Sequence, residues 1–216
     1  ELNERQNQNG HDNGNGVWQA AFDWLARPNI RLSCNYLFDE FVLDDEQKQE
    51  GKGHSRAHSL KGVYTPIKTK TSILSIYLSS ISVGTNTFRH ESGYNNFSQR
   101  NKPLGWSVGS DSREINLGVN ALYNNILITN IEIGQREIGE KNIIRSPYDE
   151  YTDSITGLFP SGEVENILYV CARLRWWWKH NLSLITEFEY KDSNRNDRAF
   201  QYNIGFDIYY PINKKI

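Results

Sequence analysis

The sequence contains no methionine, only two cysteines, and no apolar run long enough to form a membrane-spanning helix. Because methionine is missing, we expect Glu1 to follow upstream sequence that carries a signal peptide. The one uncharged stretch near helix-spanning length, residues 71–88, holds five serines and three threonines, which disfavours a transmembrane helix. Cys34 and Cys171 fit neither a metal-ligand spacing nor a redox CxxC pattern. We expect two unpaired or buried thiols.

Several catalytic motifs are also missing, since the sequence contains no HExxH, phosphate-binding loop or dinucleotide-binding pattern. The net charge of −2, with both signs intermixed, gives no basic face for nucleic acid. His54 and His58 lie four residues apart, but at the junction of a loop and a strand, so we expect no metal there. Residues 149, 150 and 153 are acidic and leave a calcium ion in a loop as an alternative. We expect no enzymatic activity and no cofactor.

Apolar and polar residues alternate with a period of two along most of the chain. Hydrophobic residues make up 38% of the sequence and aromatic residues 12%, which suits a surface that is apolar on one side. Between 182 and 190, for example, Leu184 and Phe188 alternate with Glu187 and Glu189. This alternation predicts strands. They are expected at about 17–27, 30–38, 58–65, 72–83, 113–123, 126–136, 164–176, 182–190 and 200–210.

The connections between these strands alternate between short turns and long polar loops. The longer loops are expected at about 1–16, 39–57, 84–112, 137–163 and 191–198, and the charged residues 43–56 are expected to form no packed element. Aromatic residues gather near the strand ends. Strands of about ten residues, one-sided loops and aromatic girdles are typical of transmembrane barrels.

The predicted fold is therefore an all-β, antiparallel transmembrane β-barrel. The odd count of nine strands predicts that residues 1–216 form the C-terminal half of a barrel with about eighteen strands, monomeric once complete. A soluble antiparallel sandwich would explain the alternation equally well, but not the one-sided loops. In a barrel, Arg173 and Arg175 would face the interior and pair with Glu187 or Glu189 on the next strand.

Residues 87–118 carry a family resemblance. Phe88-Arg89-His90 closes a strand, and Tyr94, Arg100 and Pro103-Leu104-Gly105 follow, before Gly109 and Asp111 lead into a strand that contains Leu117-Gly118. This pattern resembles the Wzi-like capsule assembly family. Where the family tends to place a histidine after the Leu-Gly pair of the loop, this chain has Trp106. The resemblance implies a bacterial outer-membrane barrel that holds capsular polysaccharide at the cell surface without catalysis.

The residue types of this loop suit an acidic glycan. Arginine forks match carboxylates, aromatic rings stack on sugars, and planar polar groups bind hydroxyls. The candidate polysaccharide-binding residues are Arg89, His90, Tyr94, Arg100, Trp106, Asp111 and Arg113. The same residues could instead only fold the loop. The predicted partners are surface or capsular polysaccharide and outer-membrane lipid, and the alternative function is a porin or diffusion channel for small solutes.

Overall fold

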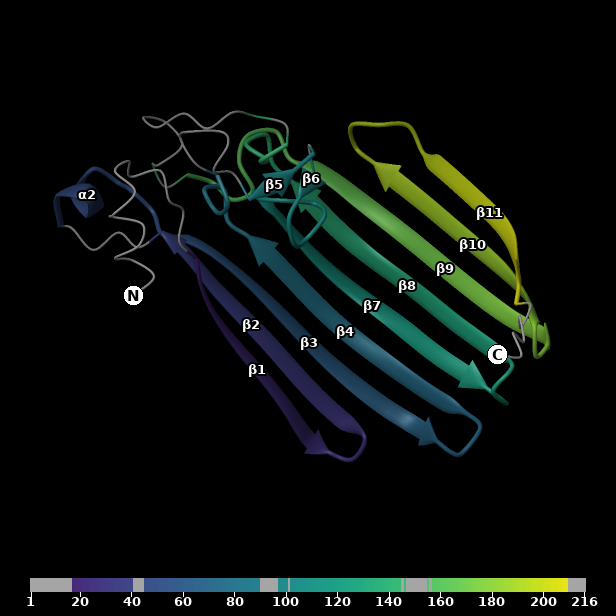
Figure 1. Ribbon diagram of the computed structural model, residues 1–216. Coiled ribbons are helices and arrows are strands. Elements are labelled where there is room, and N and C mark those ends of the chain that lie inside the picture. The colour runs from purple at the N-terminus through teal and green to yellow at the C-terminus, as the bar shows by residue number, and fades with distance from the viewer. Residues whose placement is uncertain are drawn as a thin grey trace, which may run out of the picture.

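The computed structural model describes residues 17–40, 45–89, 97–100, 102–144, 146, 155 and 157–209. Within these residues the chain forms one large antiparallel sheet of nine strands (Figure 1). In chain order they are β1 (Trp18–Arg27), β2 (Ile30–Glu40), β3 (Ser55–Lys68), β4 (Ile73–Val83), β7 (Ser112–Tyr123), β8 (Leu127–Ile138), β9 (Glu165–Lys179), β10 (Leu182–Ser193) and β11 (Ala199–Ile208). All nine predicted strands are present.

Every strand of this sheet pairs with its neighbours in the chain order, and the sheet is open, with β1 and β11 at its edges. The remaining described elements are small. They are a hairpin of β5 (Ser98–Gln99) and β6 (Lys102–Pro103) and a single short helix, α2 (Asp45–Gln49). The prediction of an all-β antiparallel fold is therefore confirmed.

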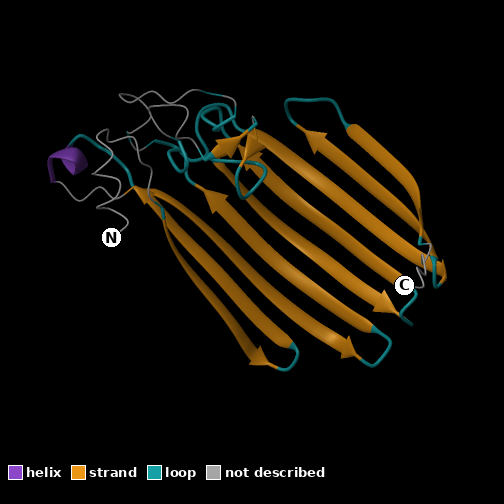
Figure 2. Cartoon of the chain, in the orientation of Figure 1, coloured by secondary structure: helices purple, strands orange, loops and turns teal. Residues whose placement is uncertain are grey.

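The short connections lie at one end of the sheet and the longer ones lie at the other end (Figure 2). Residues 28–29, 69–72, 124–126 and 180–181 form short turns at one end, called the turn end from here on. Asn124 and Asn125 have φ angles of 49° and 57°, which is the left-handed pair that a tight hairpin turn needs. The longer connections all lie at the opposite end, called the loop end. The predicted alternation of connection lengths is confirmed.

Two details differ from the expected boundaries. Residues 45–56, the described part of the charged segment, do form structure: Asp45 and Glu46 stand in the first turn of α2, where carboxylates favour a helix, and Ser55 begins β3 with 2% of its surface exposed. β3 also continues past Pro66 to Lys68. A register shift between Tyr64 and Ile67 accommodates the proline, which cannot donate a ladder hydrogen bond.

The two faces of the sheet differ in chemistry. Paired residues share a face and successive residues alternate. One side, called the apolar face, carries Trp18, Phe22, Trp24, Leu32, Leu60, Leu78, Ile115, Leu117, Ile131, Ile133, Leu168, Trp176, Leu184, Phe188, Phe200, Tyr202, Ile204 and Phe206. The other side, called the polar face, carries Asp23, Arg31, Lys61, Tyr77, Glu114, Asn116, Glu132, Arg136, Tyr169, Cys171, Arg173, Arg175, Glu187, Glu189 and Asp207.

Burial is opposite to what a soluble sheet would show. On the apolar face, Phe22, Leu117 and Phe206 are 59%, 49% and 69% exposed. On the polar face, Tyr77 and Tyr169 are only 6% and 3% exposed. A sandwich would bury its apolar face under a second layer, and no described segment provides one here.

Candidate functional site

The loop end is organised by Asp111, the residue before β7. Its side chain is fully buried and its φ angle of 55° lies in the left-handed region. The carboxylate accepts hydrogen bonds from the hydroxyl of Thr85 (2.8 Å), from the backbone nitrogen of Lys141 (3.0 Å), and from both the nitrogen (2.9 Å) and the hydroxyl (2.5 Å) of Ser161. One carboxylate therefore ties together three loop segments that are far apart in the sequence.

Asn142 makes a second junction beside it, with 2% of its surface exposed. Its amide donates to the carbonyl oxygens of Val108 and Ser110, both at 2.7 Å, and its own oxygen accepts from the nitrogen of Ile144 at 3.0 Å. Gly109 has a φ angle of 86°, and an added Cβ would meet the Ile143 side chain at 2.7 Å. These contacts hold the loop before β7 in one shape.

Residues 97–109, called the flap, pack on the loop after β4. The rings of Phe88 and Phe97 stack with centroids 5.0 Å apart, and the nitrogen of Phe97 donates to the carbonyl of Phe88 at 3.0 Å. Arg100 and Lys102 are exposed on the flap, and Trp106 is half-buried. The flap sequence contains no aspartate or glutamate. It therefore presents positive charge and one indole ring on a preformed support.

The structure separates the other predicted polysaccharide ligands. Arg89 is buried, with 5% of its surface exposed, and it donates to the carbonyl oxygen of Ser146 at 3.3 Å. Arg113 lies on the side of the apolar face and forms an ion pair with Glu137 at 2.7 Å. His90 and Tyr94 lie outside the described residues. Of the predicted set, Arg100 and Trp106 both belong to the flap, and Asp111 holds neighbouring loop segments together.

A hollow of about 520 Å³ opens beside these loops, at the loop end of β2, β3 and β4. We call it the rim hollow, and its side chains include Tyr36, His54, Arg56, His58, Lys141 and Phe159. The imidazole of His58 stacks on the ring of Tyr36, with the ring centroids 6.4 Å apart. No acidic residue is among those that line the hollow. From the sequence, His54 and His58 were considered only as candidate metal ligands, and no metal was expected there. The alternation of Arg56 and His58 at the start of β3 was the signal that they share a face.

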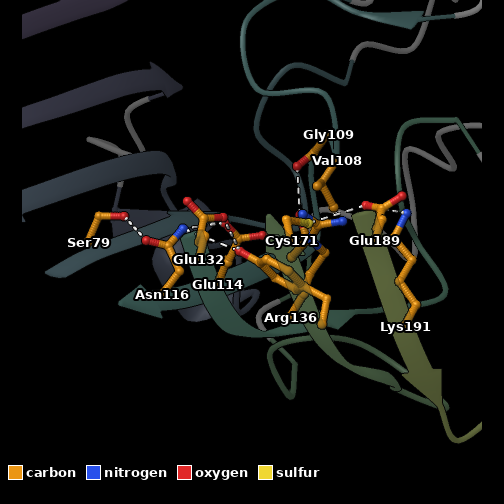
Figure 3. Close-up of polar contacts among 12 residues, drawn as sticks. Ser79, Val108, Gly109, Glu114, Asn116, Glu132, Arg136, Cys171, Glu189 and Lys191 are labelled. Carbon is orange, nitrogen blue, oxygen red and sulfur yellow. Dashed lines mark hydrogen bonds and ion pairs between the residues drawn. The ribbon is translucent and has the colours of Figure 1, made fainter. Parts of the chain in front are cut away.

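The polar face holds a connected cluster across β4, β7, β8 and β9 (Figure 3). Tyr77 and Tyr169 both donate to the Glu132 carboxylate, at 2.5 and 3.0 Å. Glu114 accepts from Asn116 at 2.9 Å and pairs with Arg136 at 2.6 Å. These polar groups satisfy one another, so the cluster stabilises the sheet.

The predicted interstrand ion pairs are present in part. Arg173 pairs with Glu187 at 2.7 Å, as expected from the alternation. Arg175 instead reaches Asp207 of β11, at 2.9 Å. Glu189 contacts Lys191 at 3.0 Å. Cys34 and Cys171 are both free, as expected.

Neither a metal centre nor a helical span is found in the described part of the chain. No three or more His, Cys, Asp or Glu residues gather there in a way that could hold a metal ion. No helix in that part is long and apolar enough to cross a membrane.

The fold defines an all-β protein built on one open antiparallel sheet. The sequence matches no protein-family model, and no curated protein matches it.

Proposed function

We propose that this chain is part of a bacterial outer-membrane β-barrel whose loop end binds an acidic surface polysaccharide. In this proposal the apolar face contacts lipid, the polar face lines the interior, and the loop end faces the outside of the cell. The protein anchors polysaccharide and catalyses no reaction. The resemblance of residues 87–118 to the Wzi-like capsule assembly family points to capsule as the polysaccharide.

The membrane part of the proposal rests on the exposed apolar face. The strands of the sheet contain 10 to 15 residues. At about 3.3 Å per residue they extend about 33–50 Å, enough to cross a hydrocarbon core of about 30 Å at a tilt. Water would strongly disfavour so large an uncovered apolar surface, whereas lipid would not.

The polysaccharide part rests on a single observation, the basic flap. Arg100 and Lys102 stand exposed on the same short segment as Trp106, without a carboxylate in the flap to neutralise them. The hydrogen bonds of Asp111 and Asn142 hold the loops under the flap, so little conformational freedom is lost on binding. A repeating polymer can also engage several copies of the protein, which raises the overall affinity.

The test compares two double variants of the whole protein. Arg100→Gln with Lys102→Gln removes both cations of the flap, whereas Lys68→Gln with Lys70→Gln removes two cations at the turn end. Polygalacturonate serves as an acidic probe and dextran as a neutral one. We expect the flap variant to bind polygalacturonate about tenfold more weakly or worse, and its cells to release capsule. The turn-end variant should behave like the wild type.

Two outcomes would contradict the proposal that the flap binds acidic glycans through its charge. Equal retention of polygalacturonate by the flap variant and the wild type would show that the flap does not bind acidic glycans. Tight binding of dextran would show that charge is not what the flap recognises. Trp106→Ala separates stacking from charge, because it should weaken the binding of both probes if the indole contacts sugar rings.

A diffusion channel is the second candidate function, and the ion pairs of the polar face favour it. The side chains of Arg173 and Glu187 remain 69% and 39% exposed although they are paired. Such partly exposed charges suit a wet interior that small solutes could cross. Conductance of the whole protein in planar bilayers distinguishes the two functions. A large, steady open pore favours the channel, and a closed barrel favours the anchor.

A further inference from the structure

The rim hollow has a charge of one sign. Arg56, His58, His54 and Lys141 line it and no acidic side chain does, so it attracts anions. Its volume of about 520 Å³ is far larger than a phosphate group needs. Tyr36 and Phe159 add aromatic rings, and Ser82, Thr85 and Asn86 add hydroxyl and amide groups. The lining therefore suits a sugar that carries phosphate.

An apolar groove of about 460 Å³ lies on the apolar face of the same strands. Its floor is Gly62 of β3, which pairs with Leu32 of β2 on one side and with Leu78 of β4 on the other. Because Gly62 has no side chain, the row Leu32–Gly62–Leu78 is hollowed, and Phe22, Leu60 and Ile115 complete its walls. The shape and chemistry of this groove suit an acyl chain.

The hollow and the groove are aligned along β3. His58 pairs with Ser82 and opposes Tyr36 in the row that lines the hollow, four residues from Gly62 along the strand. Four residues of an extended strand span about 13 Å. Leu158, which is 88% exposed, also lines the hollow and adds an apolar side chain to it. The cationic and aromatic rim hollow thus lies next to the apolar groove along β3, on the side of the loop end.

We propose that the rim hollow and this groove together bind one phosphorylated glycolipid of the surrounding membrane. The phosphate and sugar occupy the hollow, with Arg56 and His58 on the phosphate and Tyr36 against the sugar ring. The acyl chains run down the groove over Gly62. The proposal rests on the membrane part of the proposed function, since it requires the apolar face to contact lipid.

The test titrates the whole protein in a nonionic detergent with lipid A, phosphatidylglycerol or phosphatidylcholine, and counts bound lipids by native mass spectrometry. Two variants address the two halves of the site. Arg56→Gln with His58→Gln removes two of the four basic side chains of the hollow, and Gly62→Leu fills the groove. Gly62 tolerates a side chain, because an added Cβ would only touch Leu32 at 3.5 Å. The controls are Lys68→Gln at the turn end of β3 and Ala172→Leu on the apolar face of β9.

We expect one lipid A to bind saturably, in preference to both phospholipids. The charge variant and the groove variant should each bind lipid A about tenfold more weakly or worse, and both controls should stay within about twofold of the wild type. Unchanged binding in both variants would overturn the site. Equal affinity for phosphatidylglycerol would overturn the glycolipid assignment, because phosphate alone would then be recognised.

A spin label at position 184 distinguishes a failure of the glycolipid site from a failure of the proposed membrane architecture. If the label reports lipid while lipid A binding is absent or not saturable, only the glycolipid site is wrong. If the label reports water, the membrane architecture itself is wrong, and the glycolipid site is wrong with it. Binding of polygalacturonate by the flap does not depend on Arg56, His58 or Gly62, so it provides an independent check that these variants are folded.

Discussion

Tyr77 of β4 lies across Gly118 of β7 on the polar face, where an added Cβ would fall on the ring of the tyrosine. Tyr169 of β9 lies in the same way across Gly134 of β8, where an added Cβ would come within 2.5 Å of the phenol oxygen. The two tyrosines thus reach toward each other over the intervening strands, and both hydroxyls meet the Glu132 carboxylate. Because Gly118 and Gly134 have no side chains, the two tyrosine rings can lie over them and reach Glu132.

Replacing Gly118 with alanine should therefore destabilise the sheet. The new methyl group forces the Tyr77 ring away from Glu132, and overpacking of this kind costs about 1–3 kcal/mol. Urea unfolding in detergent measures the change. Gly205→Ala is the matched control, since Gly205 also lies on the polar face and an added Cβ there meets nothing within 4 Å. Equal stabilities of the two variants would show that the Tyr77 ring moves aside freely.

Two ion pairs of the polar face should differ in their importance for stability. Arg136 pairs with Glu114, whose side chain is only 6% exposed, whereas Arg173 pairs with Glu187 at 69% and 39% exposure. Arg136→Gln leaves a buried carboxylate without its cation and should cost about 3–5 kcal/mol. Arg173→Gln should cost at most about 1 kcal/mol, because water screens the exposed pair. A larger loss for Arg173→Gln in the same unfolding measurement would contradict this ranking.

The sheet could be predicted from the sequence because alternation is a local property. The period-two alternation predicts that Glu187 and Arg173 lie on one face, and the pairing of β9 with β10 then makes them neighbours. The partner of Arg175 could not be predicted in this way. Its direct neighbour on β10 is Ile185, which offers no charge, so Arg175 reaches Asp207 on the strand beyond. Such a contact depends on two registers at once, that of β9 with β10 and that of β10 with β11.

The loop end was harder to predict because its contacts span long stretches of sequence. Asp111 has the residue type of a glycan ligand, but the donors that surround it come from segments 26 to 50 residues away. The rim hollow likewise combines Tyr36, His58 and Phe159, which no local pattern connects. Residue type alone could not distinguish a side chain that contacts the ligand from one that holds the loops.

Asp111→Asn should loosen the loops and leave the sheet intact. Asparagine tolerates the left-handed backbone at this position, but its amide nitrogen replaces one of the two oxygens that accept from Thr85, Lys141 and Ser161. The donors that met this oxygen lose their acceptor. Each buried donor left without an acceptor costs about 1–3 kcal/mol. Hydrogen exchange of peptides covering 84–88 and 139–144 should become faster. Exchange in β9 and β10 should not change, and Arg113→Gln, at an exposed ion pair, is the matched control.

Protection of the loops in Asp111→Asn at the wild-type level would contradict the role of the carboxylate. The measurement also bears on the polysaccharide proposal. If the loops loosen and polygalacturonate binding weakens while Arg100, Lys102 and Trp106 are intact, then the preformed shape of the flap contributes to affinity. If the loops loosen and binding is unchanged, the charge of the flap is sufficient by itself.

The last prediction tests the two faces of the sheet directly. Leu184 and Glu187 lie on β10, three residues apart, on the apolar face and the polar face. Single cysteines at these positions, with Cys34 and Cys171 replaced by serine, carry nitroxide labels in the whole protein reconstituted into vesicles. We expect the label at 184 to be relaxed by oxygen, which concentrates in lipid, and the label at 187 by a water-soluble nickel complex. The two positions lie on one strand, about 10 Å apart along it, and both are away from the strand ends, so the comparison tests the face that each label occupies. Equal access to the nickel complex would mean that water bathes both faces, which excludes a membrane barrel and leaves a soluble sheet with an exposed apolar side.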